Sequence, residues 1–156
     1  KDAIVAVMCL CEVAAYCKKH GQTLWDMMLD TYEKYGYFKE STVSITLPGK
    51  DGVAKMKGIM SALRENAPRE LAGLRVTAVR DYQKGSRVDA LGQTSSLETP
   101  ASNVLYFELE DNNWVCIRPS GTEPKIKLYV NTKAETAEAS EALNKRLAES
   151  AQALMA

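Results

Sequence analysis

The spacing of hydrophobic residues differs between two parts of the chain. Up to about residue 36, apolar side chains recur at helical spacing, first from Asp2 to His20 and then from Leu24 to Tyr35. Thr23, with Asp26 three residues later, is typical of the N-terminus of the second helix. We therefore predict a helical hairpin. Its first helix is apolar on nearly every face, so we expect it to be buried against a partner.

After residue 41 the period becomes that of a strand. Apolar and polar residues alternate from 42 to 47, and Pro48-Gly49 then ends the predicted strand. We place a domain boundary and a hinge near residues 37–41. This boundary gives one domain of residues 1–37 and a second of residues 38–156.

The second domain is predicted to be α+β. An amphipathic helix is expected from about 53 to 65 and a second helix after the capping box of Thr132 and Glu135. The strands between these helices are expected at 74–82, 104–109, 114–117 and 126–130. The long polar stretch from Gln83 to Ser102 is predicted to be a mobile surface loop. The order strand, helix, four strands, helix predicts an antiparallel sheet with helices on one face.

Composition narrows the classes of partner. The 156 residues include 20 basic and 20 acidic side chains, so no net charge attracts the chain to nucleic acid or to an anionic membrane. Any anion site must therefore be local. The longest apolar run, Ala3 to Cys11, is about half of the ~20 residues that a membrane helix needs. We expect no membrane or targeting segment.

The cysteines are expected to be reduced thiols of a cytoplasmic protein. They are Cys9, Cys11, Cys17 and Cys116, and their spacing is not that of a disulfide framework or a zinc ribbon. Cys17 and His20 could form half of a metal site on one helix face, but no second pair completes it. Buried or incidental thiols are the preferred interpretation.

The segment Arg118 to Lys125 concentrates groups that bind anions. Arg118 can bind phosphate with two hydrogen bonds, and the hydroxyls of Ser120 and Thr122 can each donate one. Gly121 lets the backbone turn so that successive N–H groups face one concavity, and two prolines stiffen the segment. The alternative is an ordinary turn between two strands with Arg118 in solvent.

The whole segment Arg118 to Lys125, Arg-Pro-Ser-Gly-Thr-Glu-Pro-Lys, resembles the phosphate-binding loop of the α-D-phosphohexomutases. This is the family of phosphoglucomutases and phosphomannomutases. The flanking sequences Trp114 to Ile117 and Lys125 to Tyr129 look most like its bacterial phosphoglucomutase branch. Lys1 to Ile4 and Tyr32 to Gly36 look like the closing helices of the preceding domain, so the resemblance spans essentially the whole chain.

The resemblance implies a full enzyme of four domains. In this family a phosphoserine on the first domain, with Mg²⁺, exchanges its phosphoryl group with a hexose phosphate through a hexose 1,6-bisphosphate. The expected substrates are the 1- and 6-phosphates of glucose or mannose. The last domain, here residues 38–156, would have a fold like that of the TATA-box-binding protein. Residues 1–37 would end the third domain, and the N-terminal domains would be missing from this piece.

The resemblance also implies roles for single residues. Arg118, Ser120 and Thr122 would contact phosphate through their side chains and Gly121 through its backbone, with Glu123 and Lys125 supporting the loop. The segment contains no phosphoserine motif and no Asp-x-Asp-x-Asp cluster for magnesium. Ser120 as a nucleophile is disfavoured, because the only histidine lies in the helical part. The piece alone is expected to bind phosphate and to catalyse nothing.

Two other functions are compatible with parts of the sequence. A nucleic-acid-binding module is suggested by the expected fold and by the basic residues Arg118, Lys125 and Lys127, but zero net charge disfavours it. A protein-interaction module could use the apolar hairpin. We interpret that surface instead as the side that faces the missing preceding domain, since the chain begins without an initiator methionine.

Overall fold

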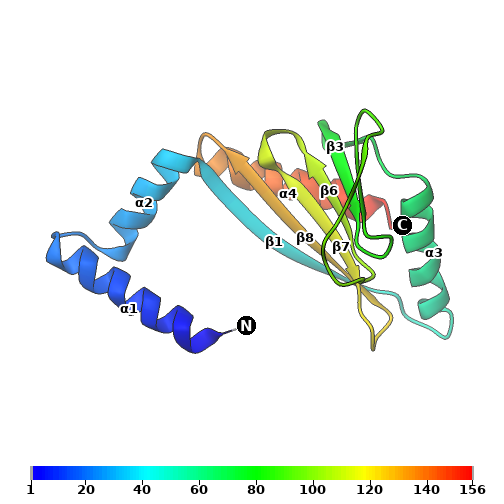
Figure 1. Ribbon diagram of the computed structural model, residues 1–156, viewed down its shortest axis with the longest axis horizontal. Coiled ribbons are helices and arrows are strands. Elements are labelled where there is room, and N and C mark those ends of the chain that lie inside the picture. The colour runs from blue at the N-terminus through cyan, green and yellow to red at the C-terminus, as the bar shows by residue number, and fades with distance from the viewer. Residues whose placement is uncertain (1, 156) are drawn as a thin grey trace. The chain divides into compact units, whose positions relative to one another are not determined.

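The computed structural model describes residues 2–155. It divides into two compact units, Lys1–Tyr37 and Phe38–Ala156, and each is described by itself. The first unit is a pair of helices and the second is a sheet with helices (Figure 1).

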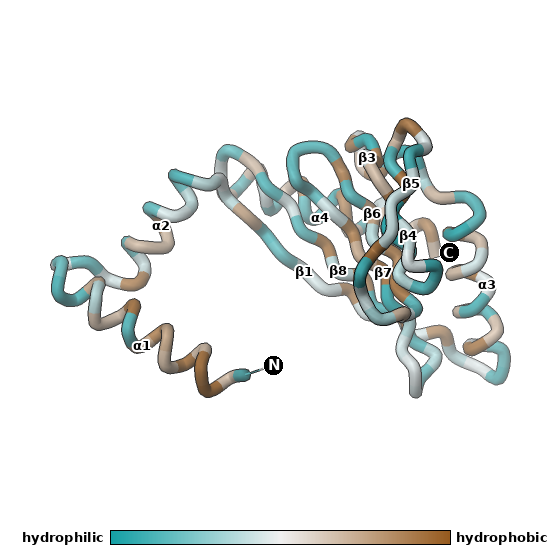
Figure 2. The backbone as a smooth tube through the Cα atoms, in the orientation of Figure 1, coloured by the Kyte–Doolittle hydropathy of each residue, from teal (hydrophilic) through white to brown (hydrophobic). Residues whose placement is uncertain are grey.

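The helical unit consists of α1 (Ala3–Lys19) and α2 (Leu24–Tyr35). The predicted capping box is confirmed, because Thr23 and Asp26 bond each other's backbone N–H at the start of α2. Cys17 of α1 is buried, but most apolar residues of this helix are exposed, among them Ile4 at 75% and Met8 at 61%. Figure 2 shows hydrophobic positions along α1. Among the described residues, no helix has both the length and the apolar character that a membrane crossing needs.

The sheet unit has more strands than predicted. Its elements are β1 (Tyr37–Thr46), α3 (Gly52–Glu65), β2 (Glu70–Leu71), β3 (Leu74–Asp81), β4 (Ser86–Asp89), β5 (Thr94–Ser96), β6 (Leu105–Leu109), the 3-10 turn η1 (Glu110–Asn112), β7 (Trp114–Pro119), β8 (Lys125–Ala134) and α4 (Ala137–Ala153). The strand order is β1-β8-β7-β6-β3-β4-β5, with β2 paired to β3. β6 and β7, both predicted as strands, form an antiparallel hairpin, and β8 is antiparallel to β7.

The hydrophobic core lies between the two helices and one face of the sheet. Strand residues that alternate along β6, β7 and β8 meet apolar residues of α3 and α4 there. The fully buried members include Leu105, Phe107, Val115, Ile117, Ile126, Leu128, Met60 and Leu147. In the view of Figure 1, α4 lies behind the strands. The predicted antiparallel sheet with helices on one face is therefore confirmed.

The predicted mobile loop from Gln83 to Ser102 is wrong, because it contains β4 and β5. Gly85 and Gly92 adopt φ of 65° and 81° in the turns before and after β4, a conformation that glycine adopts without strain. The alternating signal was weak because Val88 is the only apolar residue of β4. Pairing with β3 compensates for the low intrinsic preference of these residues for a strand.

The first strand is also longer than predicted, since β1 begins at Tyr37 and not at residue 42. The carbonyl of Lys39 accepts a hydrogen bond from Asn144 Nδ2 at 2.9 Å, which fixes β1 to α4. Residues 39–41 therefore belong to the sheet. The nearest conformational break before β1 is Gly36, with φ of 96°.

The predicted capping box at Thr132 is wrong as well. Thr132 is buried in β8 and donates from Oγ1 to the carbonyl of Ser140 at 2.9 Å. The N-cap of α4 is Thr136, whose hydroxyl accepts from the N–H of Ala139 at 3.1 Å. β8 continues to Ala134, and the N–H of Lys133 donates to Asn113 Oδ1 at 2.9 Å, so the chain is still extended at Thr132.

The opposite face of the sheet carries polar and aromatic side chains. Because Val115 and Ile117 point into the core, Trp114, Cys116 and Arg118 point to the other side of β7. Neither α3 nor α4 covers this side. We call it the open face.

Candidate functional site

Arg118 and Lys127 face each other across two neighbouring strands. They are register partners on β7 and β8, and both are exposed on the open face. Within residues 2–155, neither side chain forms an ion pair with a carboxylate. Like charges at directly opposite positions repel each other. This pair is therefore suited to an anion that neutralises both cations.

Ser120 organises the loop that follows β7. Its N–H donates to the carbonyl of Lys125 at 2.7 Å, which closes the loop between β7 and β8. Its Oγ accepts from the N–H groups of Thr122 and Glu123 at 3.4 and 3.3 Å. These two amides thus face one side of the loop, and the Ser120 O–H remains available to donate.

The loop is fixed to the connection between β1 and α3. The carbonyl of Pro124 accepts from the N–H of Leu47 at 2.9 Å. Gly52, the first residue of α3, packs closely against Leu47 and Pro124. A Cβ added at Gly52 would clash with the carbonyl of Leu47 and with the side chain of Pro124. The base of the loop is therefore held before any ligand arrives.

The two charged residues of the loop bond each other. Lys125 Nζ lies 3.0 Å from Glu123 Oε2, and Glu123 accepts the N–H of Lys125 on its carbonyl at 2.8 Å. Because the ammonium of Lys125 is partly neutralised, Arg118 and Lys127 are the stronger attraction for an anion.

A hollow of about 200 Å³ lies where the loop meets the open face. Its lining consists of Arg118, Pro119, Ser120, Gly121, Lys127 and Tyr129. Three of the site residues predicted from the sequence, Arg118, Ser120 and Gly121, are thus brought together. The other three, Thr122, Glu123 and Lys125, lie in the same loop but outside this lining.

Tyr129 belongs to this hollow and was not among the predicted site residues. The signal was present in the sequence, because Ile126, Leu128 and Val130 alternate on the core side of β8. Lys127 and Tyr129 must then share the opposite side with Arg118. Strand periodicity would have added both residues to the candidate site.

Gly121 does not give the loop the special backbone turn that the sequence predicts. Gly121 is not among the glycines with positive φ, so the turn itself does not require glycine. A Cβ added at Gly121 would meet no atom within 4 Å. Any requirement for glycine at this position must come from a ligand that approaches the backbone.

Neither a nucleophile with its base nor a metal centre accompanies the hollow. The only histidine, His20, lies in the helical unit, where its Nδ1 is 2.8 Å from the carbonyl oxygen of Tyr16. Across residues 2–155, no three His, Cys, Asp or Glu side chains lie where they could hold a metal ion. The geometry of the hollow thus supports anion binding.

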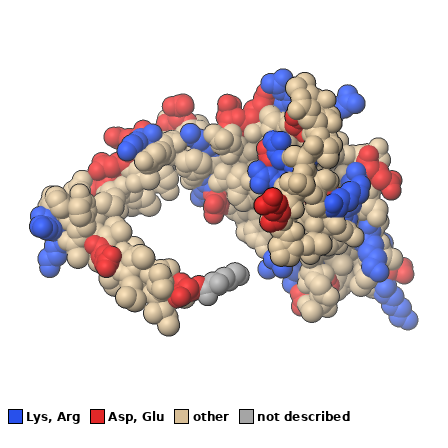
Figure 3. Space-filling model, in the orientation of Figure 1, with Lys and Arg blue, Asp and Glu red and all other residues tan. Residues whose placement is uncertain are grey.

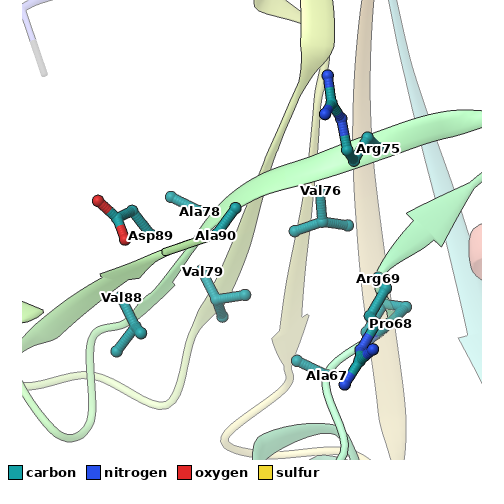
Figure 4. Close-up of a pocket in the computed structure, with 10 residues that line it drawn as sticks. All are labelled: Ala67, Pro68, Arg69, Arg75, Val76, Ala78, Val79, Val88, Asp89 and Ala90. Atoms are coloured by element: carbon teal, nitrogen blue, oxygen red, sulfur yellow. The ribbon is translucent and has the colours of Figure 1, made fainter. Parts of the chain in front are cut away.

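A second hollow, of about 500 Å³, lies at β3 and β4. In Figure 4 the side chains of Val76, Val79 and Val88 point to the same side, whereas Arg75 points away. Arg75 bonds Glu110. This hollow is floored by aliphatic groups, and its lining also includes Arg69.

Charge over the rest of the sheet unit is mixed. On the face seen in Figure 3, basic and acidic side chains are interspersed and form no surface of one sign. Nucleic-acid binding depends on a continuous basic surface that neutralises several phosphates. The pair Arg118 and Lys127 is a local feature suited to one small anion.

Sequence comparison gives the same assignment as the loop. Residues 45–150 match the family described as phosphoglucomutase/phosphomannomutase, C-terminal domain. A phosphoglucomutase of Staphylococcus saprophyticus is 40% identical over 136 residues, which cover 86% of this chain and 24% of that protein. A phosphoglucomutase of Staphylococcus aureus is 41% identical over 135 residues, with coverage of 85% and 24%. The chain thus spans about a quarter of the length of these relatives.

Structural comparison agrees on the fold. The chain is similar to the open form of the exocytosis-sensitive phosphoprotein pp63/parafusin, a phosphoglucomutase from Paramecium, with a TM-score of 0.61 at 17% identity. The match covers 99% of this chain and 26% of that structure. None of these comparisons supports the nucleic-acid-binding alternative. The chain belongs to the phosphoglucomutase/phosphomannomutase family and contains its C-terminal domain.

Proposed function

We propose that residues 38–156 bind the phosphate group of a hexose phosphate. One observation carries the proposal: Arg118 and Lys127 lie opposite each other without a carboxylate partner, beside the hydroxyl of Ser120. A phosphate dianion would relieve their repulsion and accept hydrogen bonds from both. Membership of the family makes a phosphorylated sugar the natural source of that dianion.

The loop residues would have distinct roles in binding. The planar guanidinium of Arg118 would take two phosphate oxygens, and Ser120 and Thr122 would each donate an O–H. Gly121 would present its N–H to a ligand that comes close to the backbone. Glu123 and Lys125 would hold the loop in shape through their ion pair.

We propose that the full-length protein is a phosphohexomutase. It would interconvert the 1- and 6-phosphates of glucose or mannose through a hexose 1,6-bisphosphate, and this domain would hold the phosphate group that is not reacting. Binding at a distance from the reacting phosphate would orient the sugar for transfer. The chain alone would then bind the phosphosugar without converting it.

The phosphoserine and the Mg²⁺ of such an enzyme would belong to other domains. The residues described here do not fit Mg²⁺, since no three metal-binding side chains come together within residues 2–155. We therefore derive no step of the reaction through the metal. The contribution of this chain is limited to binding, orienting and excluding water.

The helical unit would be the end of the preceding, third domain. Its exposed apolar residues on α1 are suited to burial against the rest of that domain. Domain closure over the substrate would turn about the break at Gly36, because β1 is packed from Lys39 onward. The four free cysteines favour a reducing compartment, as the cytoplasm is.

Binding can be measured on this chain by two-dimensional NMR. A few charge-assisted hydrogen bonds, reduced by the cost of ordering, net about 4 kcal/mol, which corresponds to a millimolar dissociation constant. Glucose 6-phosphate and inorganic phosphate should therefore shift the backbone amide signals of Ser120, Gly121 and Thr122 with millimolar midpoints. Glucose without phosphate should leave these signals in place.

Three variants distinguish hydrogen bonding by the planar guanidinium of Arg118 from a general effect of positive charge. Arg118→Ala should abolish the shifts, and Arg118→Lys should weaken binding because an ammonium lacks the planar fork. Arg146→Ala removes the same charge from an exposed position of α4 and should bind normally. Signals that do not move at about 50 mM ligand, tens of times the expected dissociation constant, would rule out the proposal.

A further inference from the structure

A third hollow, of about 410 Å³, opens on the sheet unit away from the loop residues. Its lining includes three aromatic residues on three strands, Phe38 of β1, Tyr106 of β6 and Trp114 of β7. Asn131 of β8 is the register partner of Trp114 and also lines the hollow. Sites for small molecules typically have volumes of about 300–1,000 Å³, so this hollow is large enough for a ring-sized ligand.

Asn131 is the residue that suggests a ligand. It is only 5% exposed, and its side-chain amide makes no hydrogen bond with any of residues 2–155. The other two buried asparagines are satisfied: Asn113 Nδ2 donates to the carbonyl of Glu110 at 2.7 Å, and Asn144 Nδ2 donates to that of Lys39 at 2.9 Å. The amide of Asn131 is not among the fully buried side-chain atoms that lack a partner, so it reaches the solvent of the hollow that it lines. An amide kept in this state is suited to a partner from outside the chain.

The surroundings of Asn131 are held rigidly. The rings of Tyr106 and Trp114 stack with centroids 5.1 Å apart, and the guanidinium of Arg80 lies 4.9 Å from the Tyr106 centroid. Glu108 binds both Arg80 and Arg87. These contacts lock the aromatic wall and leave a surplus of positive charge beside it, which disfavours a cationic ligand.

We propose that this hollow binds a carbohydrate ring. A sugar hydroxyl both donates and accepts hydrogen bonds, which matches the donor and the acceptor of the Asn131 carboxamide. The C–H faces of a pyranose are apolar and can pack on Trp114 and Phe38. The proposal needs neither Arg118 nor a phosphate group, and it therefore stands apart from the proposed phosphate loop.

Trp114 provides the reporter for a test. The chain has two tryptophans, and the other, Trp25, is 61% exposed in the helical unit. In a Trp25→Phe variant, Trp114 is the sole tryptophan, so all tryptophan emission comes from it. Maltose should change that emission in a saturable manner with a midpoint on the order of 1–10 mM, as a few hydrogen bonds would give.

Asn131→Leu in this background tests the amide itself. Leucine keeps the size of the side chain and removes its polar atoms, so the affinity for maltose should fall at least tenfold. Arg118→Ala is the matched control. It should lose phosphate binding and keep the maltose response, so failure of this proposal can be told from failure of the phosphate site.

Three results would overturn the proposal. The first is no saturable change up to about 100 mM maltose, far above a millimolar dissociation constant. The second is a response to adenosine monophosphate without one to maltose, which would point to a planar base as ligand. The third is an unchanged maltose response in Asn131→Leu. If that variant fails to fold, the side-chain amide signals of Asn131 in the Trp25→Phe chain must shift with the maltose midpoint.

Discussion

At Gly121, a substitution is expected to affect ligand binding more than the stability of the fold. Its backbone conformation is open to other residues, and an added Cβ meets nothing. We expect Gly121→Ala to leave the free energy of unfolding unchanged or to raise it by up to about 1 kcal/mol. The same change should weaken phosphate binding several-fold, because the methyl group occupies space next to the donated N–H. Chemical denaturation and the NMR titration measure the two effects.

Gly73 provides the opposite control. Its φ of 85°, in the turn between β2 and β3, is strained for any other residue. Gly73→Ala should therefore cost about 1 kcal/mol of stability and leave phosphate binding unchanged. If Gly121→Ala destabilises the fold as much as Gly73→Ala does, the glycine of the loop is structural and its proposed role in binding is wrong.

Cys116 should be the least reactive of the partly accessible thiols. Burial raises its pKa to about 11, against a smaller lowering by Arg118. At pH 8 only about one molecule in a thousand would then carry the thiolate that alkylating reagents attack. Iodoacetamide should label the exposed Cys9 and Cys11 within minutes and Cys116 far more slowly, as peptide mass spectrometry would show. Equal rates for Cys9 and Cys116 would contradict the burial.

Single residues of the site were predictable to different degrees. Arg118 and Ser120 could be found because the loop motif is local in the sequence. Lys127 and Tyr129 follow from strand alternation, which requires knowing that β7 and β8 are neighbours. Asn131 could not be singled out at all, since nothing in a sequence tells which asparagine of a strand lines a hollow.

Among the elements, β3, β4 and β6 are tied together by Glu108. Arg87 of β4 and Arg80 of β3 both bond its carboxylate, and the hydrogen bond from Arg87 is the main cause that lowers its pKa from 4.5 to about 2. The carboxylate is thus favoured in the folded state. Its contribution to stability is complete above the unfolded pKa and is lost as pH falls from about 4.5 to about 2.

Glu108→Gln should therefore destabilise the chain most at neutral pH. We expect a loss of about 1 kcal/mol at pH 7, since the cluster is partly exposed to solvent. The difference from the unmodified chain should shrink as pH is lowered toward 2, as urea denaturation at several pH values would show. Glu98→Gln, at an exposed carboxylate, serves as the control. A difference that stays constant with pH would mean that the ion pairs contribute nothing.

The elements that the sequence failed to predict share one physical cause. β4 and β5 are short and mostly polar, and they exist because they pair with β3 and with each other. Thr132 and Thr136 both look like helix caps, and the second one is used because β8 extends to Ala134. Elements with a strong apolar period of their own, such as α3 and β6, were placed within one or two residues.

At the scale of the whole molecule, packing energy is concentrated in the sheet unit. All sixteen buried members of the hydrophobic core lie between Met56 and Met155, whereas Cys17 is the one buried hydrophobic residue of the helical unit within the described chain. The phosphate loop and the hollow proposed to bind a carbohydrate ring are also built from residues of the sheet unit alone. Stability and both proposed binding functions therefore belong to the same part of the chain.

A chain that begins at Tyr37, the first residue of β1, tests this division. It should unfold cooperatively with a free energy within about 1 kcal/mol of that of the 156-residue chain, because no core residue is lost. Phosphate should shift the same loop amides with the same midpoint. Removal of the exposed apolar residues of α1 should also reduce self-association, which analytical ultracentrifugation would measure. A broad, non-cooperative transition would show that the sheet unit needs the helices to fold.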